Sequence, residues 1–136
     1  MVSMNTTVKP LDDVNVRKAV LAVFDRRAMQ LTRGGAAVGD IATHFLPPHF
    51  PGYNEAGGPE GAGVDYLSNP NGDLKLAESY MKKAGYPTGK YTGNEKFLMV
   101  GTNADPGKKS AEVAAAQFEK LGFKLNFRIV NVRSPS

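Results

Sequence analysis

The chain has 136 residues, of which 41% are hydrophobic and 22% charged, as is typical of a single globular domain. It has no cysteine, which excludes disulfide bonds and thiolate metal sites, and no apolar run near the roughly 20 residues of a membrane span. Its formal charge of +4 comes from basic residues spread along the chain, which argues against nucleic-acid binding.

The first expected element is a short strand over residues 2–8, which Pro10 ends because proline lacks the backbone donor of a strand. Asp12 and Asp13 then offer N-caps for a helix. Residues 1–5 lack the charged and apolar regions of a secretory signal, so we expect any export signal to lie outside this segment.

A single amphipathic helix is predicted from residue 16 to residue 31. Apolar side chains recur there at steps of three and four, with charged side chains mostly on the opposite side. The apolar positions are Val16, Val20, Val23, Phe24, Ala28 and Leu31. Gly34 and Gly35 end the helix, because glycine readily adopts the left-handed conformation that follows a helix.

Residues 34–72 are rich in glycine and proline and are predicted to form one long irregular loop. A loop of this length usually binds a ligand or wraps over a neighbouring part of the protein. It also contains aromatic residues, which disordered spacers rarely have. These are Phe45, Phe50, Tyr53 and Tyr66. For the two tyrosines, covering the edge of a core is favoured over lining a cleft.

A second helix is predicted between Asp73 and Gly85. Asp73 is a good N-cap, Gly85 suits the left-handed residue after a helix, and Pro87 prevents the helix from continuing. The inward-facing positions are Leu76, Ala77, Tyr80, Met81 and Ala84. Signals at both ends therefore define this helix.

A strand, a helix and a strand are predicted within residues 96–132. The apolar run 97–100 is typical of a strand covered on both faces. Asp105, followed by proline, predicts the start of a third helix, and Gly122 its end. Apolar and polar residues alternate from 124 to 132, as in a strand. With short connections, this is a βαβ unit with parallel strands and a right-handed crossover.

The predicted fold class is α/β, a mixed sheet with flanking helices. Two or three strands make a thin sheet, whose edges we expect to lack partners. We therefore interpret residues 1–136 as a single partial domain, with the Gly/Pro-rich loop 34–72 inside it.

Ligand-binding candidates lie where the strand over 96–101 ends, because ligands of open α/β sheets bind outside the carboxyl ends of the strands. Thr102 and Asn103 would donate hydrogen bonds there, beside a helix N-terminus that favours an anion. Asp105 is a third candidate, although its role as the helix cap is the favoured explanation.

The glycine-rich turn after the first helix supplies two further candidates, Gly35 and Ala37. It lacks the lysine of a phosphate-binding loop and follows a helix rather than a strand, so nucleotide binding is rejected. A helix stop with close backbone packing is the favoured role. A cleft-lining or hinge-adjacent role is the alternative.

No metal site, cofactor or catalytic residue is predicted. His44 and His49 flank two prolines, and the carboxylates nearest in sequence are Asp40 and Glu55, an arrangement that disfavours a preformed metal site. No serine, histidine and acid arrangement or pair of carboxylates stands out either, so the sequence lends catalysis no support.

Four ordered blocks resemble the large solute-binding proteins, family 5, of peptide, nickel and opine ABC importers. They lie in residues 5–26, 34–53, 73–86 and 114–125. The first contains Val-Arg-Lys-Ala and Asp-Arg, the second a glycine turn and a proline-rich loop, the third Ala-Gly-Tyr, and the fourth Leu-Gly-Phe-Lys-Leu. Tyr80 and Met81 depart from the resemblance, because the family usually has paired leucines there.

The resemblance implies a fragment of the C-terminal lobe of a receptor with a periplasmic-binding-protein type II fold. Such a receptor captures peptides or similar polar solutes and delivers them to ABC permease subunits. It would lie in the periplasm or at the cell surface, lipid-anchored or secreted, and catalyse no reaction. We expect the fragment alone to bind no solute with useful affinity and to self-associate. The alternatives are a small interaction or regulatory module and, less favoured, an enzyme.

Overall fold

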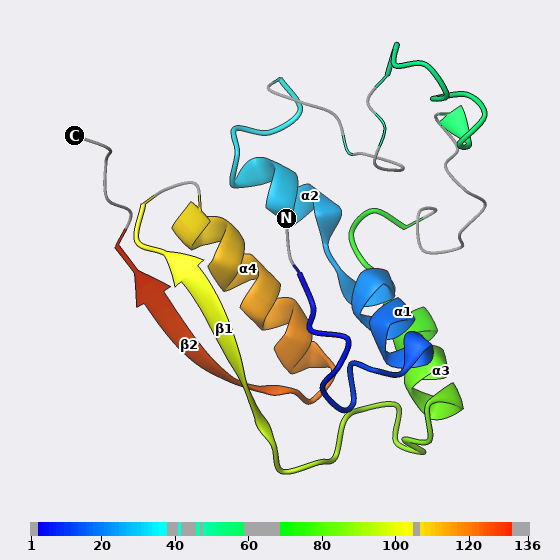
Figure 1. Ribbon diagram of the computed structural model, residues 1–136, viewed down its shortest axis with the longest axis vertical. Coiled ribbons are helices and arrows are strands. Elements are labelled where there is room, and N and C mark those ends of the chain that lie inside the picture. Colours follow the sequence, from blue (N-terminus) through cyan, green and yellow to red (C-terminus); the bar gives the residue numbers. More distant parts are fainter. Residues whose placement is uncertain are drawn as a thin grey trace.

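The computed structural model describes residues 3–37, 41, 46, 48–58, 69–104 and 107–131. Four helices and two strands lie within them: α1 (Val14–Val23), α2 (Arg26–Leu31), α3 (Leu74–Lys83), β1 (Lys96–Thr102), α4 (Gly107–Lys120) and β2 (Lys124–Val130). The sheet, α4 and the α1–α3 pair form successive layers (Figure 1). None of these described helices is both long and apolar enough to cross a membrane.

The prediction of one helix over residues 16–31 is wrong, because the helix breaks at Phe24, whose backbone is extended (ψ 125°). A continuous helix would bond the Arg26 amide to the carbonyl of Ala22. Instead, Ala22 accepts from the Asp73 amide at 2.7 Å, and Arg26 donates to Pro70 at 2.8 Å. The chain before α3 thus bonds both the acceptor and the donor of this missing helical hydrogen bond.

Three aspartates cap the helices on either side of this break and the helix that follows them in the chain. Asp13 accepts from the Asn15 amide, and Asp25 accepts from the Ala28 amide at 2.9 Å and so restarts the chain as α2. Asp73 accepts from the Leu76 amide at 3.0 Å. The predicted cap of α3 is confirmed, as is the left-handed Gly85 after it (φ 100°).

Helices α1 and α3 pack against each other and, with α4, form the hydrophobic core. Met81 of α3, Leu121 after α4, and Val16 and Val20 of α1 are its largest fully buried side chains. Burial of such side chains is the dominant stabilising term. The predicted inward face of α3 is confirmed at Ala77 and Met81, whose exposed fractions are 0%.

Strands β1 and β2 pair in parallel, from Lys96 opposite Lys124 to Thr102 opposite Val130, and α4 connects them. This confirms the predicted βαβ unit with parallel strands. Gly101 allows α4 to lie close, because a Cβ there would stand 2.8 Å from that of Ala111. The described strands form a parallel sheet, and no antiparallel strand of a mixed sheet lies among the described residues.

Two expectations about strands are wrong. Residues 3–8 form no strand, residues 6 and 7 form a turn, and the Asn5 side chain accepts hydrogen bonds from both the amide and the hydroxyl of Thr7. Strand β1 is not covered on both faces, because Leu98 and Val100 remain 62% and 57% exposed. The apolar run identified the strand but not what covers it.

The described residues of the predicted loop 34–72 contain no α-helix or strand, in agreement with the prediction. Phe50 is 57% exposed and Tyr53 is half-buried. Phe45 and Tyr66 lie outside the described residues.

Candidate functional site

The carboxyl end of the sheet carries the predicted polar residues. Thr102 is the last residue of β1, and its hydroxyl donates to the carbonyl of Ala104 at 3.4 Å. Asn103 donates from its side chain to Asn131, which follows β2, at 2.8 Å, and its backbone amide donates to Val130 at 3.2 Å. Both strand ends are thus tied together by a polar link.

The start of α4 approaches this polar end closely. A Cβ on Gly107 would collide with the hydroxyl of Thr102, so the two residues lie this close because residue 107 is glycine. Asp105, the predicted cap and candidate ligand-binding residue, lies outside the described residues. The Lys108 amide donates to the carbonyl of Ala104 at 3.1 Å, which keeps this turn tight.

The glycine turn that supplied Gly35 and Ala37 follows α2, whose end lies beside the start of α4. The hydroxyls of Thr32 and Ser110 are 2.8 Å apart and join the two helices. Gly35 is buried with φ 80°, and its amide donates to Gln30 at 3.0 Å, which is the geometry of a helix stop. Ala37 is exposed.

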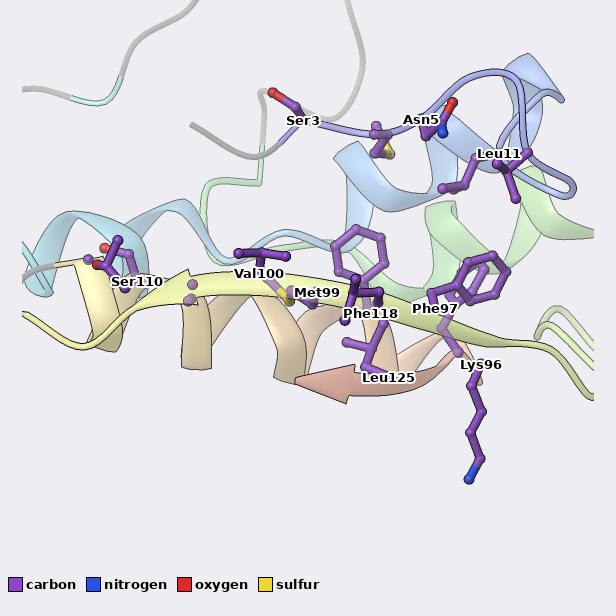
Figure 2. A pocket seen from close by; sticks show the side chains of 18 of the residues that line it. Ser3, Asn5, Leu11, Lys96, Phe97, Met99, Val100, Ser110, Phe118 and Leu125 are labelled. Atoms are coloured by element: carbon purple, nitrogen blue, oxygen red, sulfur yellow. The ribbon is translucent and has the colours of Figure 1, made fainter. Parts of the chain in front are cut away.

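A groove of about 730 Å³ runs along one edge of β1 (Figure 2). Ser3, Asn5 and Leu11 lie along one side, and Phe97, Met99 and Val100 lie on β1 at the other side, with Phe118 of α4 between them. Thr102, Gly107 and Ser110 also line it, so the groove reaches the polar end of the sheet. It is mainly apolar in character.

Sequence reasoning anticipated a sheet with partnerless edges but not this groove. Its far wall includes residues 3–5, which the sequence assigned to a strand. The signal available was the apolar run of β1, because such a run needs cover that α4 alone does not supply.

A second hollow, about 710 Å³, lies beside an aromatic cluster at the other end of the sheet. Tyr91 stacks on Phe123 with ring centroids 5.0 Å apart and meets Tyr86 edge-on at 5.6 Å. Acidic residues surround these rings: Asp12, Asp13 and Glu95.

Burial raises the pKa of Tyr86 above its ordinary value, and the charges of Tyr91, Asp13, Asp12 and Glu95 raise it further. Burial also raises the pKa of Tyr91, as does the charge of Glu95, against an opposing backbone hydrogen bond at Glu95. Both phenols therefore favour their neutral form in the folded protein.

Metal-binding geometry is absent from the described part of the chain, which holds no group of three or more His, Cys, Asp or Glu side chains able to bind one ion. His49 is exposed with φ 70°, and His44 lies outside the described residues.

Two solved structures share this architecture. The chain superposes on a clavulanic acid biosynthesis oligopeptide-binding protein with a TM-score of 0.72 and 24% identity, covering 96% of this chain and 22% of that one. It also superposes on a periplasmic oligopeptide-binding protein of an oligopeptide ABC transporter from Borrelia burgdorferi, with a TM-score of 0.55 and 22% identity, covering 94% of this chain and 23% of that one. These likenesses show an α/β fold of the type II periplasmic binding proteins.

The chain belongs to the bacterial extracellular solute-binding proteins, family 5, because residues 1–134 match the middle region of that family. It is also 29% identical over 126 residues to heme-binding protein A of Haemophilus influenzae, covering 92% of this chain and 21% of that protein. The chain thus spans about a fifth of the length of the relatives it matches. The family resemblance noted in the sequence is confirmed.

Proposed function

We propose that residues 1–136 form part of the C-terminal lobe of a receptor that captures peptides or similar polar solutes for an ABC importer. The family match over residues 1–134 carries this proposal. The oligopeptide-binding names of both structural relatives support peptides as the solute class. The heme-binding relative keeps other solutes among the outcomes of the test.

In this proposal the polar end of the sheet is the chain's share of the solute site. Thr102 and Asn103 lie at the carboxyl end of β1, where open α/β sheets bind ligands, and Asp105 follows them in the chain. Gly35 and Ala37 belong to the neighbouring turn after α2 and would border the same cleft. The receptor acts without catalysis, outside the cytoplasm, lipid-anchored or secreted, and hands its solute to ABC permease subunits.

A receptor of this kind closes two lobes on its ligand, and a site must bury most of a ligand to hold it. We therefore expect the intact receptor to bind a peptide from a di- to oligopeptide panel in calorimetry, and residues 1–136 alone to show no micromolar binding. Heme and Ni²⁺ chelates complete the panel. Micromolar peptide binding by the isolated chain would contradict the proposal that both lobes share the solute site. If the intact receptor binds only heme, heme replaces peptides as the proposed solute.

The isolated chain should also self-associate, because its sheet has an outer face that α4 does not cover. On that face Leu98, Val100 and Val130 are 62%, 57% and 43% exposed. Exposed apolar patches of this kind favour association. Sedimentation velocity at rising concentration should show a growing weight-average mass, and Leu98→Lys should reduce it. A mass that stays monomeric at high concentration would refute this expectation.

A further inference from the structure

The net charge of the chain is concentrated on α1 and α3, which form the layer farthest from the sheet (Figure 1). This pair has five basic residues and one acidic residue, and thus a net charge of +4: Arg17, Lys18, Lys75, Lys82, Lys83 and Glu78. The whole chain has 17 basic and 13 acidic residues, so the rest of it holds twelve of each. The fold therefore gathers the excess positive charge on one layer, although basic residues are spread along the sequence.

Two lysines of this pair meet at one aromatic ring. The ammonium of Lys18 on α1 lies 5.7 Å from the centroid of the Tyr80 ring, and that of Lys83 on α3 lies 5.1 Å from it. The face of a tyrosine ring attracts cations, so Tyr80 holds both charges near the line where the helices meet. Both lysines are exposed, and neither forms an ion pair with a carboxylate of the described residues.

The aspartates at the starts of the two helices act elsewhere. Asp13 accepts from the Asn15 amide and Asp73 from the Leu76 amide. Each carboxylate therefore faces the positive end of a helix dipole, which its charge offsets. The two ammonium groups at Tyr80 are left to attract an anion from outside the described chain.

Exposed apolar side chains stand beside these charges. Val14, Lys18 and Leu21 are spaced four and three residues apart, so they share one face of α1. Val14 and Leu21 are 50% and 39% exposed. Together with Tyr80 and Lys83 of α3 they form what we call the basic surface. Basic and apolar side chains exposed on one helical face are typical of proteins that bind at a membrane interface.

We propose that the basic surface binds the anionic phospholipids of the membrane at which the receptor works. The proposal goes beyond solute capture and rests on the proposed function only for the place of the receptor outside the cytoplasm. Complementary charge selects the occupant, because each basic residue close to an anionic lipid surface raises the affinity by about fivefold. Lys18 and Lys83 bind phosphate groups, while Val14 and Leu21 enter the headgroup layer.

A lipid surface fits better than a small anion or an acidic protein. Lys18 and Lys83 line neither of the two hollows described above, so the basic surface lacks their enclosing walls. An acidic protein would bind through fixed ion pairs and would leave Val14 and Leu21 without a function. A fluid layer of headgroups accepts both the charged and the apolar side chains without a preformed pocket.

Vesicle binding tests the proposal. The intact receptor, prepared without any lipid anchor, should co-sediment with vesicles of equimolar phosphatidylglycerol and phosphatidylcholine, and not with phosphatidylcholine alone. Joint substitution of Lys18→Gln and Lys83→Gln should lower the affinity by about twentyfold, at about fivefold for each lysine. Raising the salt from about 0.1 M to about 1 M should release the receptor, because the screening length falls from about 10 Å to about 3 Å.

Matched variants separate this surface from charge in general. Lys120→Gln with Lys124→Gln removes the same charge from exposed positions outside α1 and α3, and should change the affinity by about twofold at most. Lys18→Arg with Lys83→Arg keeps the charge and should keep the binding. An equal loss in both glutamine pairs overturns the proposal, as does a receptor that ignores phosphatidylglycerol.

A fluorescence measurement locates the contact without removing a charge. A polarity-sensitive fluorophore on Leu21→Cys should shift to the blue when phosphatidylglycerol vesicles are added, whereas the same fluorophore on Ala116→Cys, an exposed position of α4, should not shift. Equal shifts at both positions would contradict a contact through the basic surface. This readout decides the matter even if a lysine variant fails to fold.

The competing partners give different results. If the receptor binds its permease in neutral lipid through Lys18 and Lys83 but ignores phosphatidylglycerol vesicles, the surface fits an acidic protein and the proposal is wrong. Solute calorimetry is independent of all these measurements. A receptor that binds anionic vesicles but no solute keeps the lipid surface and refutes the proposed function, and one that binds peptide but no vesicles does the reverse.

Discussion

The α1–α3 pair and the sheet differ in how completely residues 1–136 build them. In the helical pair, Val16, Ala19 and Val20 meet Ala77 and Met81, and all five are at most 1% exposed. In the sheet, α4 packs on one face, while Leu98 and Val100 lie on the other face with more than half of their surface exposed. Apolar composition alone therefore does not establish burial, which depends on whether a second layer is present.

The largest expected effect contrasts one side chain from each region. Met81→Ala should lower the free energy of unfolding by about 3 kcal/mol, because it leaves a cavity in the core. Leu98→Ala should change it by less than about 0.5 kcal/mol in the isolated chain, because that side chain is 62% exposed. Urea denaturation of both variants measures the contrast, and equal losses would show that the sheet is covered in solution.

A smaller effect is expected at the junction that completes the helical pair. Gly72 has φ 92°, and a Cβ there would collide with the backbone oxygen of Val23, so Gly72→Ala should cost about 2 kcal/mol. Gly85 has a similar φ of 100° but nothing within 4 Å of its Cβ position. Gly85→Ala should therefore cost about 1 kcal/mol, from backbone strain alone. Thermal melts compare the stability of the two variants. Equal losses of stability would show that the collision with Val23 adds nothing to the cost at residue 72.

The smallest effect is a loss of stability at alkaline pH. The pKa values of Tyr86 and Tyr91 are raised in the folded protein, so the folded state holds these protons more tightly than the unfolded state does. Their contribution is fully present below the ordinary tyrosine pKa of about 10 and is lost as the pH rises through the folded values. Urea midpoints across this range should fall, and less steeply in Tyr86→Phe. A midpoint that rises with pH there would contradict the raised values.

Much of the fold could be predicted from local signals. Asp73 and Gly85 mark the ends of α3 by capping chemistry that acts within a few residues. The βαβ unit follows from two short strand patterns around one helical pattern. The polar end at Thr102 and Asn103 could be located because it follows directly after β1 in the chain.

Other features depend on residues far apart in sequence. The helical periodicity gives no sign of the break at Phe24. The break depends on Pro70 and Asp73, which form the backbone hydrogen bonds of Arg26 and Ala22 in place of the helix. The turn at residues 6 and 7 is stabilised by the hydrogen bonds from Thr7 to the Asn5 side chain, which compete with an otherwise strand-like pattern.

The sequence by itself determined the ends of α3, the parallel order of two strands around α4 and the family of the chain, because caps, periodicity and motifs are local. Only the tertiary structure decided that α1 and α2 are separate helices, that one face and one edge of β1 lack cover in the described residues, and that residues 3–5 lie across a groove from β1. Burial and pairing are relations between distant segments, and no local pattern contains them.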